Sequence, residues 1–117
     1  MSAHYLQVCT AVPSEEVAGQ LARRILEARL AAAVQLVGPI RSTYWWQGTI
    51  RTTPEWLCVS KTTARRFQGL AALIAAHHPY EVPEITATPI SHGTRDYLSW
   101  ISEEASGVAE AERPGGW

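Results

Sequence analysis

The chain has 117 residues, of which 46% are hydrophobic and 18% are charged, and its formal net charge at pH 7 is −1. A chain of this size and composition can bury one core without disulfides or structural metals, so we expect a single domain. The balanced charge offers no basic surface for nucleic acid and no stretch is long enough for a membrane span, so we expect neither as a partner.

The N-terminal segment, residues 1–8, lacks the basic start and the long apolar run of a secretory signal, so we expect a cytoplasmic protein. The chain has two cysteines, Cys9 and Cys58. They are too few for a disulfide scaffold, and the cytoplasm is reducing, so we expect two free thiols.

The first third of the chain predicts a strand followed by a helix. Residues 5–12 are apolar and β-branched, which is typical of a buried strand, and Pro13 ends it. Ser14 is a good helix N-cap, and apolar residues then recur every three or four positions. We expect this helix to run from about residue 15 to residue 29.

The middle of the chain predicts a long antiparallel hairpin. Residues 33–37 alternate in polarity as in a strand, Gly38-Pro39 bends the chain, and residues 40–46 continue as extended chain to a turn at Gln47-Gly48. Residues 49–51 lead back, and a further strand follows at 56–60. Two extended segments joined by a short glycine-containing turn favour a hairpin.

The last third predicts a helix, a strand and a short closing helix. Thr63 is a possible N-cap, an apolar stripe runs from there to His78, and Pro79 ends the helix. Residues 83–89 predict a strand, and 96–104 a helix. We expect one domain over 1–105 and a flexible tail over 106–117, which is rich in glycine and ends in Trp117.

The order strand, helix, strand, strand, helix, strand is a split βαβ repeat. This repeat predicts an α+β ferredoxin-like plait, with a four-stranded antiparallel sheet and two helices on one face. Its first and third strands lie side by side in the sheet, so Cys9 and Cys58 are possible neighbours without being bonded.

Several motifs resemble those of the CutA divalent-cation tolerance family, in family order and spacing over roughly residues 6–102. They are Thr10-Ala-Val-Pro, Leu30-Ala-Ala-Ala-Val, Ser42-Thr-Tyr-Trp-Trp-Gln-Gly, Lys61-Thr-Thr, His77-His-Pro-Tyr-Glu-Val-Pro-Glu and Asp96-Tyr-Leu-Ser-Trp-Ile. The resemblance implies a homotrimer similar in architecture to the PII signalling proteins, with long hairpins that reach neighbouring subunits.

The aromatic residues agree with such an assembly. The chain has five tryptophans, and those on an exposed hairpin are hard to bury in a monomer. We therefore place Tyr44, Trp45 and Trp46 at the trimer interface, where aromatic side chains concentrate. Stacking on RNA bases is the alternative for such a stripe, but no basic residues accompany it.

The resemblance also implies copper, or another divalent cation such as zinc, bound through Cys9, His77 and His78. Thiolate and imidazole are ligands that suit these metals. The family usually has a cysteine where this chain has Ala33, and the missing thiol weakens any role of that position as a metal ligand or redox partner. A structural alternative stays open, in which both histidines cap the end of their helix and Cys9 is a small buried hydrophobe.

A second possible site is an intersubunit cleft lined by Lys61, Tyr80 and Glu84. It belongs to an alternative function, a PII-like regulator that binds a small anion or nucleotide; a plain salt bridge between Lys61 and Glu84 is equally open. The chain has no nucleophile elbow, phosphate-binding loop or metalloprotease motif. We therefore expect a binding protein and not an enzyme.

Overall fold

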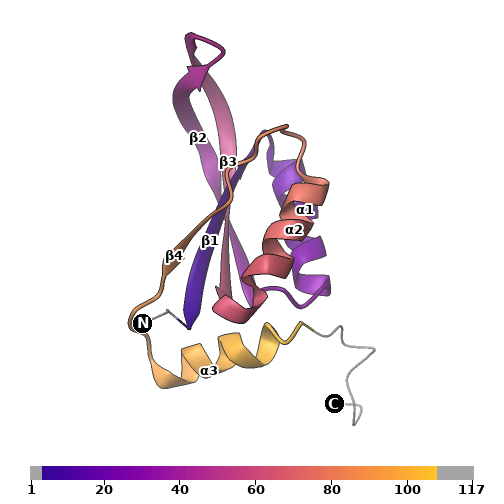
Figure 1. Cartoon of the computed structure of the whole chain (residues 1–117), viewed down its shortest axis with the longest axis vertical. Helices are drawn as coiled ribbons and strands as arrows, with labels where there is room; N and C mark the ends of the chain where they lie inside the picture. The colour runs from indigo at the N-terminus through magenta and orange to yellow at the C-terminus, as the bar shows by residue number, and fades with distance from the viewer. Residues whose placement is uncertain (1–3, 108–117) are drawn as a thin grey trace.

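The computed structural model describes residues 4–107 and contains four strands and three α-helices. They follow in the order β1 (Tyr5–Val12), α1 (Glu15–Glu27), β2 (Ala33–Trp46), β3 (Thr49–Thr63), α2 (Phe67–His77), β4 (Thr86–Pro89) and α3 (Arg95–Glu104) (Figure 1). No helix in this part of the chain is long and apolar enough to cross a membrane. Apart from Ser106 and Gly107, the predicted tail lies outside the described residues.

The sheet has the strand order β2-β3-β1-β4, and every neighbouring pair is antiparallel. Figure 1 shows α1 and α2 together on one face of this sheet and α3 across its lower end. The predicted ferredoxin-like plait is therefore confirmed, with its extended hairpin and short closing helix.

Several predicted element boundaries were wrong. The segments predicted at 49–51 and 56–60 belong to one continuous strand, β3. Helix α1 ends at Glu27 instead of 29, and Arg29 has a left-handed φ of 58°. Thr63 makes no side-chain cap, and a 3₁₀ turn (Ala64–Arg66) precedes α2, which ends at His77. Of the predicted strand at 83–89, only Thr86–Pro89 pairs with β1.

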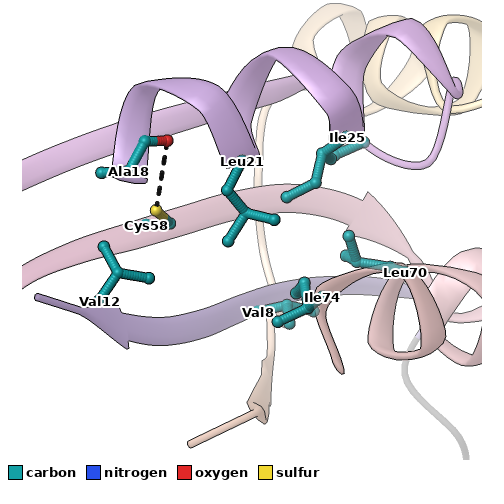
Figure 2. Packing of buried hydrophobic residues seen from close by; sticks show 9 residues of the cluster. Val8, Val12, Ala18, Leu21, Ile25, Cys58, Leu70 and Ile74 are labelled. Carbon is teal, nitrogen blue, oxygen red and sulfur yellow. Dashed lines mark hydrogen bonds between the residues drawn. The ribbon is translucent and has the colours of Figure 1, made fainter. Parts of the chain in front are cut away.

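The core lies between the sheet and the two helices that cover it. Figure 2 shows its main contributors, with Val8 and Val12 from β1, Leu21 and Ile25 from α1, Leu70 and Ile74 from α2, and Cys58 from β3. The Cys58 thiol donates a long hydrogen bond of 3.8 Å to the Ala18 carbonyl. Complete burial of each large aliphatic side chain stabilises the fold by about 1.5–3 kcal/mol.

The opposite face of the sheet, which we call the second face, carries a different set of residues. Because side chains alternate along a strand, Val8 and Thr10 point toward the helices and Cys9 points away from them. Cys9 pairs with Val59, whereas Cys58 pairs with Thr10. The two cysteines thus lie on adjacent strands but on opposite faces, and both are free thiols.

The β2–β3 hairpin extends well beyond β1 and gives the molecule its length of 53 Å (Figure 1). The two strands pair as far as Trp46 and Thr49, with a register shift between Val37 and Ile40. The turn at Gln47 and Gly48 is confirmed, and both residues have positive φ, at 49° and 81°. The hairpin carries its aromatic residues past the layer of helices.

Candidate functional site

The histidine pair lies at the end of α2, but the two side chains have different surroundings. His77 is exposed in the last turn, while His78 is 9% exposed. The Tyr80 backbone N–H donates to Nδ1 of His78 at 3.1 Å, and Nε2 lies 2.8 Å from the Ala11 carbonyl oxygen. These partners assign the neutral ring with its proton on Nε2. To bind a metal ion, His78 would have to give up one of these bonds.

Cys9 lies half-buried on the second face, near one acidic and one basic side chain. Burial raises the pKa of its thiol above 9.0, the Glu84 carboxylate raises it further, and the Lys61 ammonium lowers it. Lys61 donates a hydrogen bond to Oε1 of Gln7. Within residues 4–107, no ion pair joins Lys61 to Glu84.

These residues do not form a metal centre within one chain. Among the described residues, no group of three or more His, Cys, Asp or Glu side chains has an arrangement that would hold a metal ion. Ala33 pairs with Lys61, which pairs in turn with Gln7. Position 33 is therefore on the second face, and Cys9 supplies the only thiol there.

A cavity of about 460 Å³ lies between the hairpin and the segment after α2. Its wall combines aromatic rings with carboxylates and one guanidinium group; the polar and aromatic lining residues are Tyr44, Trp46, Arg51, Glu55, Tyr80, Glu81 and Glu84. Two of the three residues predicted for an intersubunit cleft, Tyr80 and Glu84, thus line one cavity, whereas Lys61 does not.

The three aromatic residues predicted at the trimer interface are all exposed in the single chain. Tyr44 and Trp46 project from the same side of β2 and line the cavity, and Trp45 projects from the other side. Trp45 is 71% exposed, the largest exposure among the large aromatic side chains of residues 4–107.

Glu55 is the site residue that the sequence interpretation missed. It is 6% exposed, and the Tyr80 hydroxyl donates to its Oε2 at 2.8 Å. The pKa of Tyr80 is raised, mainly by burial, then by its hydrogen bond to Glu55 and by the charge of that carboxylate. Alternation along β3 was an available signal, because Glu55 shares a strand side with Leu57 and Val59 in an otherwise apolar run.

A series of hydrogen bonds therefore connects three separate segments around the cavity. The Ala11 carbonyl at the end of β1 contacts His78, the His78 ring contacts the Tyr80 backbone, and the Tyr80 hydroxyl contacts Glu55 on β3. The rings of His78 and Tyr80 also pack against each other, with centroids 4.9 Å apart. These hydrogen bonds fix the segment after α2 against the hairpin.

The comparisons with known proteins agree on one family. Residues 6–104 match the family model described as CutA1 divalent ion tolerance protein. A relative from Thermus thermophilus, named divalent-cation tolerance protein CutA, is 47% identical over 96 residues, which is 82% of this chain and 93% of the relative.

Solved structures give the same result. One from Thermus thermophilus, described as divalent cation tolerance protein Cut A1, is 45% identical with a TM-score of 0.83, over 86% of this chain and 97% of that one. One from Archaeoglobus fulgidus, described as a periplasmic divalent cation tolerance protein CutA, is 36% identical with a TM-score of 0.84, over 86% and 98% of the two chains.

Proposed function

Because the chain belongs to the CutA1 divalent ion tolerance family, we propose that it is a non-catalytic, homotrimeric protein that binds copper or a similar transition metal ion. The observation that carries this proposal is the half-buried Cys9 thiol on the second face, beside the Glu84 carboxylate. A thiolate selects soft transition metals over hard cations such as Mg²⁺. The family is named for tolerance and not for a reaction.

A site built on Cys9 needs ligands from more than one chain. Zinc takes three or four protein ligands, and one chain brings no such group together within residues 4–107. Cys9 supplies the thiolate, and the exposed His77 is the imidazole that is free to meet a neighbouring chain. His78 contributes by holding the segment that carries Glu84.

The trimer is supported by what the single chain leaves exposed. Val37 is 46% exposed on the second face, and Trp45 and Ile50 are 71% and 62% exposed on the hairpin. Burying such apolar area between subunits is favourable by about 25 cal/mol per Å². We expect light scattering to give the mass of three chains, and a Trp45→Asp substitution to lower that mass.

The direct test of metal binding is a calorimetric titration of the reduced, metal-free protein with copper(I) without oxygen, and then with zinc. We expect saturable binding that weakens at least tenfold in Cys9→Ser and also in His77→Ala. His92→Ala is the matched control, because His92 is another exposed histidine and lies in the loop before α3. If Cys9→Ser and His77→Ala both bind as tightly as the parent protein, this site is wrong.

A second candidate function is PII-like regulation by a small ligand, and the cavity beside the hairpin favours it. Its volume of about 460 Å³ falls within the usual range for small-molecule sites. The ligand would contact the hairpin, and the hairpin would signal ligand binding to a partner protein. A thermal-shift screen of metabolites and nucleotides tests this function, because a specific ligand stabilises the folded state.

The cytoplasm is the compartment that we propose for this activity. Cys9 and Cys58 are free and lie on opposite faces of the sheet, so they cannot form a disulfide with each other that would protect them from oxidation. A reducing compartment keeps both thiols available. Cell fractionation tests this assignment, and recovery of the protein outside the cytoplasmic membrane would contradict it.

A further inference from the structure

The cavity beside the hairpin has a strongly acidic wall, and the metal proposal uses only the Glu84 carboxylate of this wall. Glu55, Glu81 and Glu84 all line it, and the one basic lining residue is Arg51. Within residues 4–107, the two ion pairs are Arg23 with Glu27 and Arg29 with Glu104, so none of these three carboxylates is paired with a cation. The cavity therefore has an unbalanced negative charge.

Glu55 is the least solvated of these acidic groups. Its side chain is 6% exposed, and a buried carboxylate is costly unless cations or hydrogen-bond donors surround it. Tyr80 donates to Oε2 at 2.8 Å, while Oε1 has no partner among residues 4–107. Since Glu55 also lines the cavity, the free oxygen is available to a ligand there.

Aromatic rings make up much of the remaining wall. Tyr44 and Trp46 project into the cavity from β2, and Tyr80 enters from the segment after α2. The face of an aromatic ring attracts ammonium and guanidinium groups, and tryptophan does so most strongly. A carboxylate beside aromatic faces is a recurrent way to recognise an organic cation.

We propose that this cavity binds a small organic cation, an ammonium or guanidinium group on a short alkyl chain. Its charged group donates to Oε1 of Glu55, and its alkyl part packs against Trp46 and Tyr80. This proposal shares Glu84 with the metal site but uses neither Cys9 nor His77, and it names a ligand class for the cavity of the second candidate function.

The same wall disfavours the other classes of ligand. An anion such as a nucleotide would face three carboxylates with only Arg51 to balance its charge. A bare metal ion would need a cluster of acidic ligands, and among the described residues no group of three or more is arranged to hold one. An organic cation needs a single carboxylate and an aromatic surface, and both are present.

The test is a calorimetric titration of the full-length protein with n-butylamine and with agmatine, beside n-butanol, ATP and Mg²⁺. We expect saturable binding of at least one of the two amines and none of n-butanol, ATP or Mg²⁺. A blocked Gly-Arg-Gly peptide distinguishes the sources of the cation. Binding of agmatine but not of the peptide supports a free small molecule, and binding of both supports a site that also accepts a basic side chain.

Glu55→Gln is the decisive variant, because it removes the charge and keeps an oxygen that accepts from Tyr80. We expect it to weaken amine binding at least tenfold. Glu27→Gln is the matched control, since it removes an exposed carboxylate on α1, outside the cavity, and we expect it to bind amines as the parent protein does. Circular dichroism confirms that both variants are folded.

Trp46→Phe gives a second variant, which keeps an aromatic ring but weakens its attraction for a cation. We expect a smaller loss of affinity for the amines than in Glu55→Gln. The proposal is overturned if neither amine binds saturably, if n-butanol binds as well as n-butylamine, or if Glu55→Gln leaves the affinity unchanged.

Discussion

Thr10 is a buried polar residue whose replacement by valine should stabilise the protein. Its side chain is 1% exposed and points toward the helices, and among residues 4–107 its hydroxyl has no hydrogen-bond partner. An unpaired buried hydroxyl costs about 1–3 kcal/mol in mutational studies, and the added methyl group contributes about 0.8 kcal/mol when it fits. We allow for imperfect fit and expect Thr10→Val to raise the free energy of unfolding by about 1–2 kcal/mol.

The matched control is Thr62→Val, the same substitution at a threonine that is 0% exposed. The Thr62 hydroxyl donates to the Leu30 carbonyl at 2.7 Å, so valine removes that bond and leaves the carbonyl with one partner fewer. We expect a loss of about 1 kcal/mol. The two variants should therefore shift stability in opposite directions.

The assay is guanidinium denaturation of both variants and the parent protein at one fixed protein concentration, because subunit association contributes to stability. The transition midpoint should move up for Thr10→Val and down for Thr62→Val, with unchanged slopes. If Thr10→Val lowers the midpoint as much as Thr62→Val does, then the Thr10 hydroxyl has a partner in solution and the reasoning fails.

Gly38→Ala should destabilise the protein, because the new Cβ would lie 2.5 Å from the Trp56 ring. Gly19→Ala is its counterpart on α1, where a new Cβ has no atom within 4 Å, and it should stabilise the protein by about 1 kcal/mol. Thermal denaturation of the two variants checks both directions. Burial raises the pKa of the Cys58 thiol from 9.0 to about 11, so its contribution to stability is complete below pH 9 and is lost as pH rises toward 11. Between pH 8 and pH 10.5, the free energy of unfolding measured in urea should fall by about 2 kcal/mol more in the parent protein than in Cys58→Ser. Equal losses in the two proteins would show that ionisation of Cys58 is not the cause. Burial also raises the pKa of the Cys9 thiol, so a bound metal must displace its proton, and copper affinity should rise about tenfold from pH 7.5 to pH 8.5 in the parent protein but not in Cys9→Ser.

The fold could be predicted from the sequence because its periodicities are strong. Alternation and turn residues predicted the hairpin, and the split βαβ order placed β1 beside β3, as the structure confirms. The boundary of β4 could not be predicted in this way. Residues 83–85 look as strand-like as 86–89, but Tyr80 ties the preceding segment to Glu55 and draws it away from the edge of β1.

The site was only partly predictable, for a related reason. The motifs identified His78 and Tyr80 as important but gave no information about their hydrogen bonds, which depend on the Ala11 carbonyl and on Glu55. Glu55 precedes Tyr80 by 25 positions. A contact over such a separation depends on how the hairpin and the segment after α2 are placed by the whole fold.

The two faces of the sheet explain why the proposed functions lie where they do. The face covered by α1 and α2 is complete within one chain, because both helices and the sheet bury a continuous apolar core there (Figure 2). The second face and the hairpin leave Val37, Trp45 and Ile50 exposed, together with the Cys9 thiol. Substitutions on this side should change assembly and ligand binding together, whereas core substitutions such as Thr10→Val should change stability alone. Binding assays on this side must therefore always be accompanied by a measurement of molecular mass.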